Sequence, residues 1–345
     1  MSLLLDHSKA FSGNFLDWAR GKGRVLIVSH DNPDPDSLAA AFALKHLFLV
    51  KNGQEATITF GGIIGRSENR VMVRELEIGA VPIDFVDLDH YGMVCMVDTQ
   101  PGTGNNSYPA DRPVHLVVDH HPLRPQTDEC RWIDVRVNYG ASATILFEYL
   151  VAQEISLSTK LATILFYAIK SETQDLGREW AQADREAYLH LIPLVNNHIL
   201  FKITHPKVPR EYFYSYNRAL ENAKVYDQVL VFNLYDIDNP DIVAEMADFL
   251  VRMQGVETVL GMGRFESREI LSLRTQSETV IAGDVIQNVL GDLGPAGGHA
   301  MIAGGQIRYL KGERAVQKEL ESSLTRRLLE ALGMDPRQGR RLISS

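Results

Sequence analysis

The first two-thirds of the chain alternates short apolar runs with longer stretches in which apolar positions recur at helical spacing. This alternation is typical of β-α-β units arranged around a parallel sheet. Strands are predicted at 24–29, 56–60, 93–97 and 115–118, and helices at 37–50 and from Ser158 to Asp175. The pattern therefore predicts an α/β fold whose N-terminal domain is a parallel, doubly wound sheet.

The α/β rhythm stops where Pro206 and Pro209 stand among scattered aromatic residues. A second α/β segment follows, with predicted strands at 228–232, 258–262 and 269–274 and helices at 241–255 and 317–332. We therefore expect a catalytic domain over residues 1–195, a linker over 196–225 and a smaller α/β substrate-binding domain over 226–345. The active site is expected in the cleft between the two domains.

Composition and charge narrow the class of protein. Hydrophobic residues make up 45% and charged residues 23%, the balance of a globular protein. The net charge of −9 argues against binding long duplex nucleic acid through phosphate contacts, because such binding needs clustered Lys and Arg. Cys95 and Cys130 have no CxxC spacing, which fits a reducing cytoplasm. Without an apolar run of about eighteen residues, no membrane span is expected.

Three acidic and histidine-bearing motifs each follow an apolar strand. In a parallel sheet these strand ends open the crevice that holds ligands. A polar residue after a strand is usually only a turn residue, but three such motifs converging on one edge point to a site. The motifs are VSHDNPDPDS with His30, Asp34 and Asp36, MVDTQ with Asp98, and VVDHHP with Asp119, His120 and His121.

Carboxylates and imidazoles that converge repel one another unless they are protonated or bind a cation. Asp and His without Cys suit manganese, with magnesium, cobalt, iron and zinc as alternatives. The motifs offer more ligands than one ion needs. Two ions about 3.5–4 Å apart, sharing a bridging carboxylate, would activate a water and hold phosphoryl oxygens for in-line attack. The sequence therefore predicts a two-metal phosphoesterase.

These motifs resemble those of the DHH phosphoesterases. HDNPDPDS is similar to the family's first motif, VDT to its second and DHHP to its third, while Ser171–Gly177 falls where the fourth belongs. Downstream, GPAGGHAMIAGG at 294–305 is similar to the glycine-rich signature of the family's associated C-terminal domain. The resemblance extends from Arg24 to Arg308.

The resemblance implies roles for the residues of the first three motifs. His30 and Asp34 would bind one ion, and Asp36 and His120 the other. Asp98 would bridge the two ions.

The remaining two residues of the third motif are expected beside the ions. Asp119 would support the metal ligands. His121 would touch substrate phosphate, with a histidine hydrogen-bonded within its own loop as the alternative.

The fourth motif departs from the family pattern. Relatives carry Thr-Asp-Thr, with the aspartate as a metal ligand, where this chain has Ser171-Glu172-Thr173. Glu172 is one methylene longer and is the expected ligand, with Asp175 as the alternative three residues later. If neither carboxylate reaches the metal, activity would be low or absent.

The second domain offers candidate substrate ligands. Gly297 and Gly298 before His299 would let backbone N–H groups approach an anion closely. Arg274 resembles the family's substrate-binding arginine. Arg264, near another strand end, is either a substrate ligand or a solvated surface residue.

The resemblance is to the standalone nanoRNase and pAp-phosphatase branch. It implies hydrolysis of short oligonucleotides, linear dinucleotides or 3′-phosphoadenosine 5′-phosphate. Within the enzyme class, the alternatives are a cyclic-dinucleotide phosphodiesterase and a single-strand-specific exonuclease. From another class, a nucleotide-binding or regulatory protein could have lost catalysis through the change at Glu172. A homodimer is left open.

Overall fold

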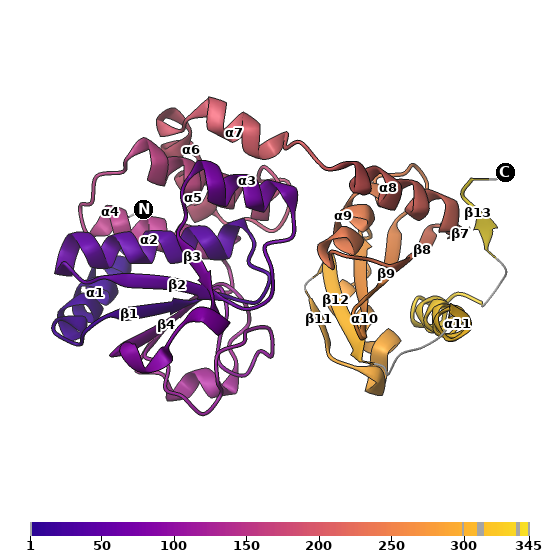
Figure 1. Cartoon of the computed structure of the whole chain (residues 1–345). Coiled ribbons are helices and arrows are strands. Elements are labelled where there is room, and N and C mark those ends of the chain that lie inside the picture. Colours follow the sequence, from indigo (N-terminus) through magenta and orange to yellow (C-terminus); the bar gives the residue numbers. More distant parts are fainter. Residues whose placement is uncertain (1, 299, 309–313, 336–338, 344–345) are drawn as a thin grey trace. The chain divides into compact units, whose positions relative to one another are not determined.

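The computed structural model describes residues 2–298, 300–308, 314–335 and 339–343, and it divides into two compact units, Met1–Pro206 and Lys207–Ser345 (Figure 1). The first unit is built on a six-stranded sheet in which every neighbouring pair is parallel. Its strands are β1 (Val25–Val28), β2 (Ala56–Phe60), β3 (Ala80–Pro82), β4 (Met93–Val97), β5 (Leu116–Asp119) and β6 (Trp132–Val135).

The strand order is β3-β2-β1-β4-β5-β6, so the order reverses between β1 and β4. This is the doubly wound order, and the reversal point is where such sheets bind ligands. The predicted parallel α/β fold is confirmed. The sequence pattern did not predict β3 and β6, because both strands are partly exposed and lack a continuous apolar run.

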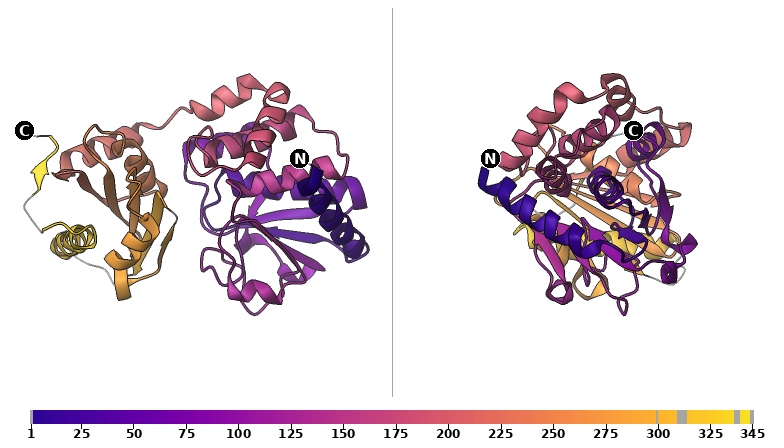
Figure 2. Two further views of the ribbon diagram at one scale, coloured as in Figure 1. Left: turned by 180° about the vertical axis from the view of Figure 1, so that it is seen from behind. Right: turned by 90° about the vertical axis from the view of Figure 1, so that its left-hand side faces the viewer.

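Helices cover one face of this sheet (Figure 2). Apolar side chains of α1, α2, α4 and α5 form one core with the strands, while the opposite strand face is covered by loop and 3₁₀ segments. The helices of the unit are α1 (Ser2–Ala19), α2 (Pro35–Asn52), α3 (Ser67–Glu75), α4 (Ser142–Ala152), α5 (Thr159–Glu172), α6 (Gln182–Leu191) and α7 (Asn197–Thr204).

Local sequence determines where α2 begins and ends. The Asp34 carboxylate accepts a hydrogen bond from the Ser37 N–H at 2.9 Å, and Pro35 occupies the first helical position. Gly53 ends the helix in the left-handed conformation with φ 63°, which glycine adopts without steric cost. The capping residue Asp34 is also a predicted metal ligand, so the helix start positions that side chain.

The second unit is a mixed seven-stranded sheet of order β11-β12-β10-β9-β8-β7-β13, in which only β8 and β9 are parallel. One face packs against α8 and α9 and the other against α10 and α11. Its strands are β7 (Lys224–Tyr226), β8 (Val229–Asp236), β9 (Thr258–Phe265), β10 (Arg268–Thr275), β11 (Ala296–Gly298), β12 (Ile302–Arg308) and β13 (Arg340–Arg341). Its helices are α8 (Arg210–Asn222), α9 (Asp241–Leu250), α10 (Ala282–Leu290) and α11 (Arg314–Ala331).

The range 196–225, predicted as a linker, holds α7 and α8. Ile203 of α7 is buried on the first unit and Ala219 of α8 on the second, so tertiary packing makes helices of a segment that its prolines marked as irregular. The two units divide between Pro206 and Lys207. The expected active site in an interdomain cleft stays a prediction. Among the described helices, none is both long and apolar enough to cross a bilayer.

Replacing a buried leucine of α2 tests the core of the first unit. Leu44→Ala should lower the free energy of unfolding by about 2–5 kcal/mol, because Leu44 is fully buried and its loss leaves a cavity. Leu49→Ala, on the same helix but 55% exposed, should change it by less than about 0.5 kcal/mol. All three tryptophans, Trp18, Trp132 and Trp180, lie in the first unit, so urea unfolding followed by tryptophan fluorescence reports on that unit. Equal effects of the two substitutions would contradict this packing.

Candidate metal centre

Three neighbouring strands deliver the predicted site residues to one edge of the sheet. His30 follows β1, Asp98 follows β4 directly and Asp119 ends β5. Because β1, β4 and β5 are adjacent and parallel, their carboxyl ends meet at the point where the strand order reverses. The structure therefore brings together motifs that are nearly ninety residues apart in the chain.

Asp98 lies between the two histidines of the site. Its Oδ2 is 3.5 Å from His30 Nε2, and its Oδ1 is 3.5 Å from His120 Nε2. The Ser142 hydroxyl donates to Oδ1 at 2.9 Å. Asp98 is 2% exposed and has φ 56°, a backbone conformation that costs a non-glycine residue energy and is found at functional sites. The two carboxylate oxygens thus face different partners, as a bridging ligand requires.

The first group of candidate ligands comprises His30, Asp34 and Asp98, whose ligand atoms all lie within 4.8 Å of one another. His30 Nε2 is 3.5 Å from Asp34 Oδ1. The other ring nitrogen, Nδ1, lies 2.9 Å from the Asp31 carbonyl oxygen and can donate to it. That hydrogen bond selects the tautomer in which Nε2 offers a lone pair toward the carboxylates.

The second group comprises Asp98, His120 and His121. His120 Nδ1 lies 3.1 Å from the Tyr139 carbonyl oxygen, so His120 Nε2 is likewise turned toward Asp98. His121 Nδ1 is 3.6 Å from Asp98 Oδ1 and 2.8 Å from Asp119 Oδ1. His121 therefore lies within the cluster of candidate ligands, and it also makes the hydrogen bond to Asp119 within its own loop.

Asp119 is fully buried and organises the third motif. Its Oδ1 accepts from the backbone N–H groups of His120 at 2.7 Å and His121 at 3.1 Å, and its Oδ2 accepts from Gln100 Nε2 at 2.8 Å. Burial opposes ionisation, but the hydrogen bond from His121 and the charges of both histidines lower the pKa of Asp119 to about 2. These contacts fit the supporting role expected of Asp119.

Asp36, 1% exposed, joins the site to the start of α4. Its two oxygens accept from the backbone N–H groups of Ser142 at 2.7 Å and Ala143 at 2.8 Å. Its Oδ2 also lies 3.9 Å from His120 Nε2. A carboxylate at a helix N-terminus satisfies N–H groups that lack helical partners and interacts favourably with the helix dipole.

Charge interactions within the cluster shift the pKa values of Asp36 and His30. Burial and the charges of Asp98, Glu172 and Asp34 raise the pKa of Asp36 well above its usual value. Burial opposes the charged form of His30, but Asp34 and Asp98 raise its pKa well above the ordinary range. A divalent cation would remove the repulsion while keeping every carboxylate ionised. The donor set of carboxylates and imidazoles without thiolates suits Mn²⁺, Mg²⁺ or Co²⁺.

The two candidates of the fourth motif lie in different surroundings. Glu172 ends α5, and burial together with the charge of Asp34 raises its pKa, so its carboxylate interacts with the same cluster. Arg178 Nη2 lies 3.6 Å from Glu172 Oε1. Asp175 is 57% exposed and accepts from Lys170 and, at 3.0 Å, from the Tyr188 hydroxyl. Glu172 is therefore the residue of this motif that the structure places near the first three motifs.

Arg274, the predicted substrate arginine, is only 7% exposed. Its Nε donates to Asp248, and its Nη1 donates to Ser272 Oγ at 2.8 Å and to the Leu273 carbonyl at 3.0 Å. This guanidinium would have to exchange at least part of these contacts to fork a phosphate.

The other candidates of the second unit are separate from Arg274. Arg264, at the end of β9, donates to Asp236 Oδ1 at the end of β8. Gly297 and Gly298 belong to β11 and are exposed. His299 lies outside the described residues.

Sequence reasoning missed three residues that touch the site. Gln100 lies two positions beyond Asp98 in the MVDTQ motif, and that position was its only sequence signal. Ser142 begins α4, and its hydroxyl donates to Asp98 Oδ1. Arg178 had no motif to mark it and is placed beside Glu172 by the loop that follows α5.

Family models match both parts of the chain. The DHH family N-terminal domain matches residues 24–169 and the DHHA1 domain matches residues 226–326. The chain belongs to the DHH family. The recognised resemblance is thereby confirmed, and the first unit contains the DHH domain and the second the DHHA1 domain.

A curated relative of this DHH protein is an uncharacterized protein of Methanocaldococcus jannaschii, 31% identical over 320 residues that cover 91% of this chain. The chain spans 65% of that relative's length. Among solved structures, an exopolyphosphatase-related protein from Bacteroides fragilis has a TM-score of 0.73 at 14% identity, covering 94% of this chain and 98% of its own. RecJ from Thermus thermophilus in complex with Mn²⁺ has a TM-score of 0.53 at 12% identity, covering 97% and 55%. At these identities the likeness concerns the fold.

A buried ion network supports the DHH domain behind the site. Arg136 donates to Asp134 Oδ2 at 2.7 Å, to Glu148 Oε2 at 2.6 Å and to the Tyr139 hydroxyl at 3.1 Å. The carbonyl of the same Tyr139 contacts the His120 ring. Burial opposes the charge of Asp134, but the hydrogen bond and charge of Arg136 lower its pKa.

Because the folded pKa of Asp134 lies below its unfolded value, this carboxylate stabilises the fold above the unfolded pKa, and that contribution is lost as the pH falls through the folded pKa. Asp134→Asn should therefore lower the urea midpoint at about pH 7, and the difference from wild type should shrink below about pH 4. Asp128→Asn, an exposed control in the same unit, should show no such pH-dependent difference. A deficit of Asp134→Asn that is constant with pH would contradict the linkage.

Proposed function

We propose that this DHH protein is a two-metal, Mn²⁺-dependent phosphoesterase of short nucleotide substrates. The observation that carries the proposal is Asp98, whose two oxygens face His30 and His120 at equal distances of 3.5 Å. A carboxylate in that position can bridge two cations. The Mn²⁺ in the Thermus thermophilus RecJ structure makes manganese the first ion to test.

In this proposal each histidine and its neighbouring aspartate serve one ion. His30 and Asp34 would hold the first ion, His120 and Asp36 the second, and Asp98 would contact both. When bound, two such ions lower the pKa of a water and clamp the oxygens of a phosphoryl group. The protein itself orients the two rings, because the backbone carbonyls of Asp31 and Tyr139 lie within hydrogen-bond distance of Nδ1 of His30 and His120.

The groups around the ions act on substrate and on ligand position. His121, with its side chain 32% exposed, is placed to touch a phosphate oxygen. Asp119 keeps His121 oriented through its short hydrogen bond. Glu172 would supply a further carboxylate to one ion, and Arg178 lies 3.6 Å from that carboxylate and would help to orient it.

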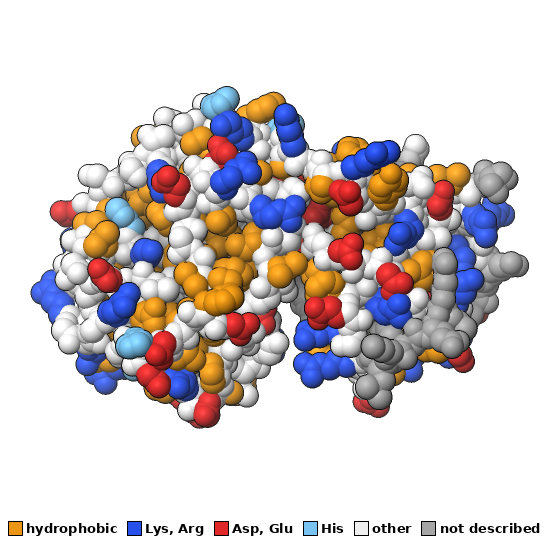
Figure 3. Space-filling view, viewed as in Figure 1, with side chains coloured by type: hydrophobic (Ala, Val, Ile, Leu, Met, Phe, Trp, Pro, Cys, Tyr) orange, Lys and Arg blue, Asp and Glu red, His pale blue; other side chains and the backbone are white. Residues whose placement is uncertain are grey.

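Several features support short substrates. The net charge is −9, and on the face shown in Figure 3 Lys and Arg side chains are interspersed with Asp and Glu on both units. Long nucleic acid is bound through clustered cations instead.

We propose short oligonucleotides, linear dinucleotides or 3′-phosphoadenosine 5′-phosphate as substrates in a reducing cytoplasm, with the DHHA1 domain contributing substrate contacts. The proposed contacts come from Arg264, Arg274, Gly297, Gly298 and His299.

The test is a substrate panel with Mn²⁺-loaded full-length protein. The panel holds 3′-phosphoadenosine 5′-phosphate, di- to pentanucleotides, a cyclic dinucleotide and a long labelled single strand. We expect the short linear members to be hydrolysed fastest, with chelation abolishing turnover. Asp98→Asn should reduce kcat by about 100-fold or more, because charge stabilisation at the reacting phosphate is lost. Asp111→Asn, at an exposed aspartate of the same unit, is the matched control.

The pattern of rates separates the alternatives. Fastest cleavage of the long strand, with a steep salt dependence, would indicate an exonuclease. Fastest cleavage of the cyclic member would indicate a cyclic-dinucleotide phosphodiesterase. Bound Mn²⁺ without turnover of any member would indicate a nucleotide-binding or regulatory protein, and unchanged rates in Asp98→Asn would refute the bridging role.

Substitution of Glu172 tests the fourth motif. Glu172→Gln should weaken Mn²⁺ binding by about 10–100-fold, the effect expected when a supporting carboxylate of a metal shell is neutralised. Glu172→Asp keeps the charge and should lose less affinity. Glu179→Gln, at an exposed position in the loop that follows α5, serves as the control. Titration followed by the electron paramagnetic resonance of free Mn²⁺ measures all three, and equal affinity of Glu172→Gln and wild type would exclude Glu172 as a ligand.

A further inference from the structure

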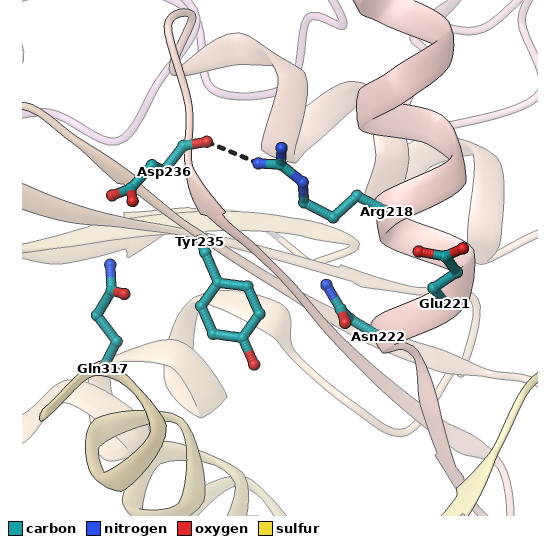
Figure 4. A pocket seen from close by; sticks show the side chains of 6 residues that line it. All are labelled: Arg218, Glu221, Asn222, Tyr235, Asp236 and Gln317. Carbon is teal, nitrogen blue, oxygen red and sulfur yellow. Dashed lines mark hydrogen bonds between the residues drawn. The ribbon is translucent and has the colours of Figure 1, made fainter. Parts of the chain in front are cut away.

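The DHHA1 unit contains a polar groove that the proposed phosphoester chemistry does not use. One cavity of about 350 Å³ is lined by residues of α8, the end of β8 and α11 (Figure 4). A second cavity of about 290 Å³ shares Glu221, Asn222 and Tyr235 with the first, so the two adjoin. The size lies at the lower end of the range for small-molecule sites, about 300–1,000 Å³. The first cavity is lined by Arg218, Glu221, Asn222, Tyr235, Asp236 and Gln317.

The groove lies along the edge of β8, where backbone carbonyl groups already accept hydrogen bonds. β7 pairs with only the first three residues of β8, and beyond them side chains of α8 take over. Asn222 donates to the Asn233 carbonyl at 2.9 Å, and Arg218 donates to the carbonyls of Leu234 and Asp236, each at 2.9 Å. An added peptide strand would need those same carbonyls. The groove therefore suits a small molecule better than a peptide.

Gln317 of α11 offers the groove a hydrogen-bond donor that has no acceptor among the described residues. The residue is 3% exposed, and its Nε2 has no hydrogen-bond partner among the described residues. Buried donors in folded proteins are nearly always paired, because an unpaired one loses its hydration without compensation. Figure 4 shows the Gln317 amide pointing toward Asp236 beside the Tyr235 ring. An acceptor atom on a ligand in the cavity would satisfy this donor.

Tyr235 offers a flat surface next to that amide. It sits at the β-bulge of β8 with φ 53°, and its hydroxyl donates to Glu321 Oε2 at 3.0 Å. The fixed ring can stack on a planar heterocycle, as aromatic residues stack on bases. Carboxamides such as those of Gln317 and Asn222 match the donor and acceptor pattern of a base edge.

The second cavity adds positive charge a short way along the groove. Its charged lining residues are the cations Lys224, Lys318 and Arg341 and the carboxylates Glu221 and Glu321, and Lys224 is 3.4 Å from Glu321. Cations therefore outnumber carboxylates in this cavity, although the chain has a net charge of −9. They suit an anionic group attached to the heterocycle.

We propose that this groove is a binding site for a nucleoside monophosphate, with the base between Tyr235 and Gln317 and the phosphate toward Lys318 and Arg341. The site is distinct from Arg274, one of the two proposed substrate arginines of the same unit. The other, Arg264, is ion-paired with Asp236, which lines the first cavity. Arg274 pairs with Val259 near the start of β9, whereas the groove lies beside the other end of that strand, about 17 Å away along five residues. The proposal stands independently of the proposed phosphoesterase activity.

The experiment uses full-length Asp98→Asn protein in EDTA, so that metal-dependent binding and turnover do not contribute. Isothermal titration calorimetry with AMP, GMP, CMP and UMP should give saturable binding of at least one nucleotide with Kd below about 1 mM. Ribose 5-phosphate, which lacks the base, should bind at least about tenfold more weakly. Gln317→Leu in the same background should weaken the nucleotide by about tenfold or more. Gln287→Leu, at an exposed glutamine of α10, should leave the affinity unchanged.

Hydrogen exchange locates the nucleotide without any change to the groove. In the Asp98→Asn protein, the nucleotide should slow hydrogen exchange at amides of α8 and of residues 316–320. This measurement tests the proposal even when the Gln317→Leu protein does not fold. Absence of saturable binding, equal affinity of the Gln317→Leu protein, or protection confined to the first unit would each overturn the proposal. Equal binding of ribose 5-phosphate would overturn base recognition.

Discussion

Repulsion among buried carboxylates at one edge of a parallel sheet is the constraint on which the DHH unit depends. Asp36 and Asp98 are almost fully buried, and burial together with the charge of Asp98 raises the pKa of Asp36. Isolated charges in such a place would be expelled or neutralised. Here they are held by backbone N–H groups, His30, His120 and a serine hydroxyl, and a divalent cation would complete the arrangement.

The same contacts tie the site to the elements that carry it. Asp34 caps α2, and Asp36, two residues later, accepts hydrogen bonds from N–H groups at the start of α4. Asp119 of the third motif accepts a hydrogen bond from Gln100, two residues after Asp98. The candidate ligands are therefore positioned by helix starts and strand ends, which are among the more rigid parts of a fold.

The DHHA1 unit organises its charges differently. Arg274 and Arg264 are each paired with an aspartate, Asp248 and Asp236, so neither presents an isolated cation. The groove beside β8 instead combines a buried Gln317 Nε2, which has no hydrogen-bond partner among the described residues, with an aromatic ring and flanking cations. One unit thus concentrates candidate metal ligands, and the other holds the groove proposed for a nucleotide.

The sequence by itself determined the parallel α/β architecture, the positions of β1, β2, β4 and β5, and the three motifs at their ends, because apolar periodicity and strand-end chemistry are local properties. It could not decide that Glu172 lies near the first three motifs while Asp175 pairs with Lys170, nor that Gln100 and Ser142 support Asp119 and Asp98. Those relations join residues from separate segments. Only the packing of helices and loops on the sheet brings such side chains within hydrogen-bond distance, and no spacing along the chain encodes that distance.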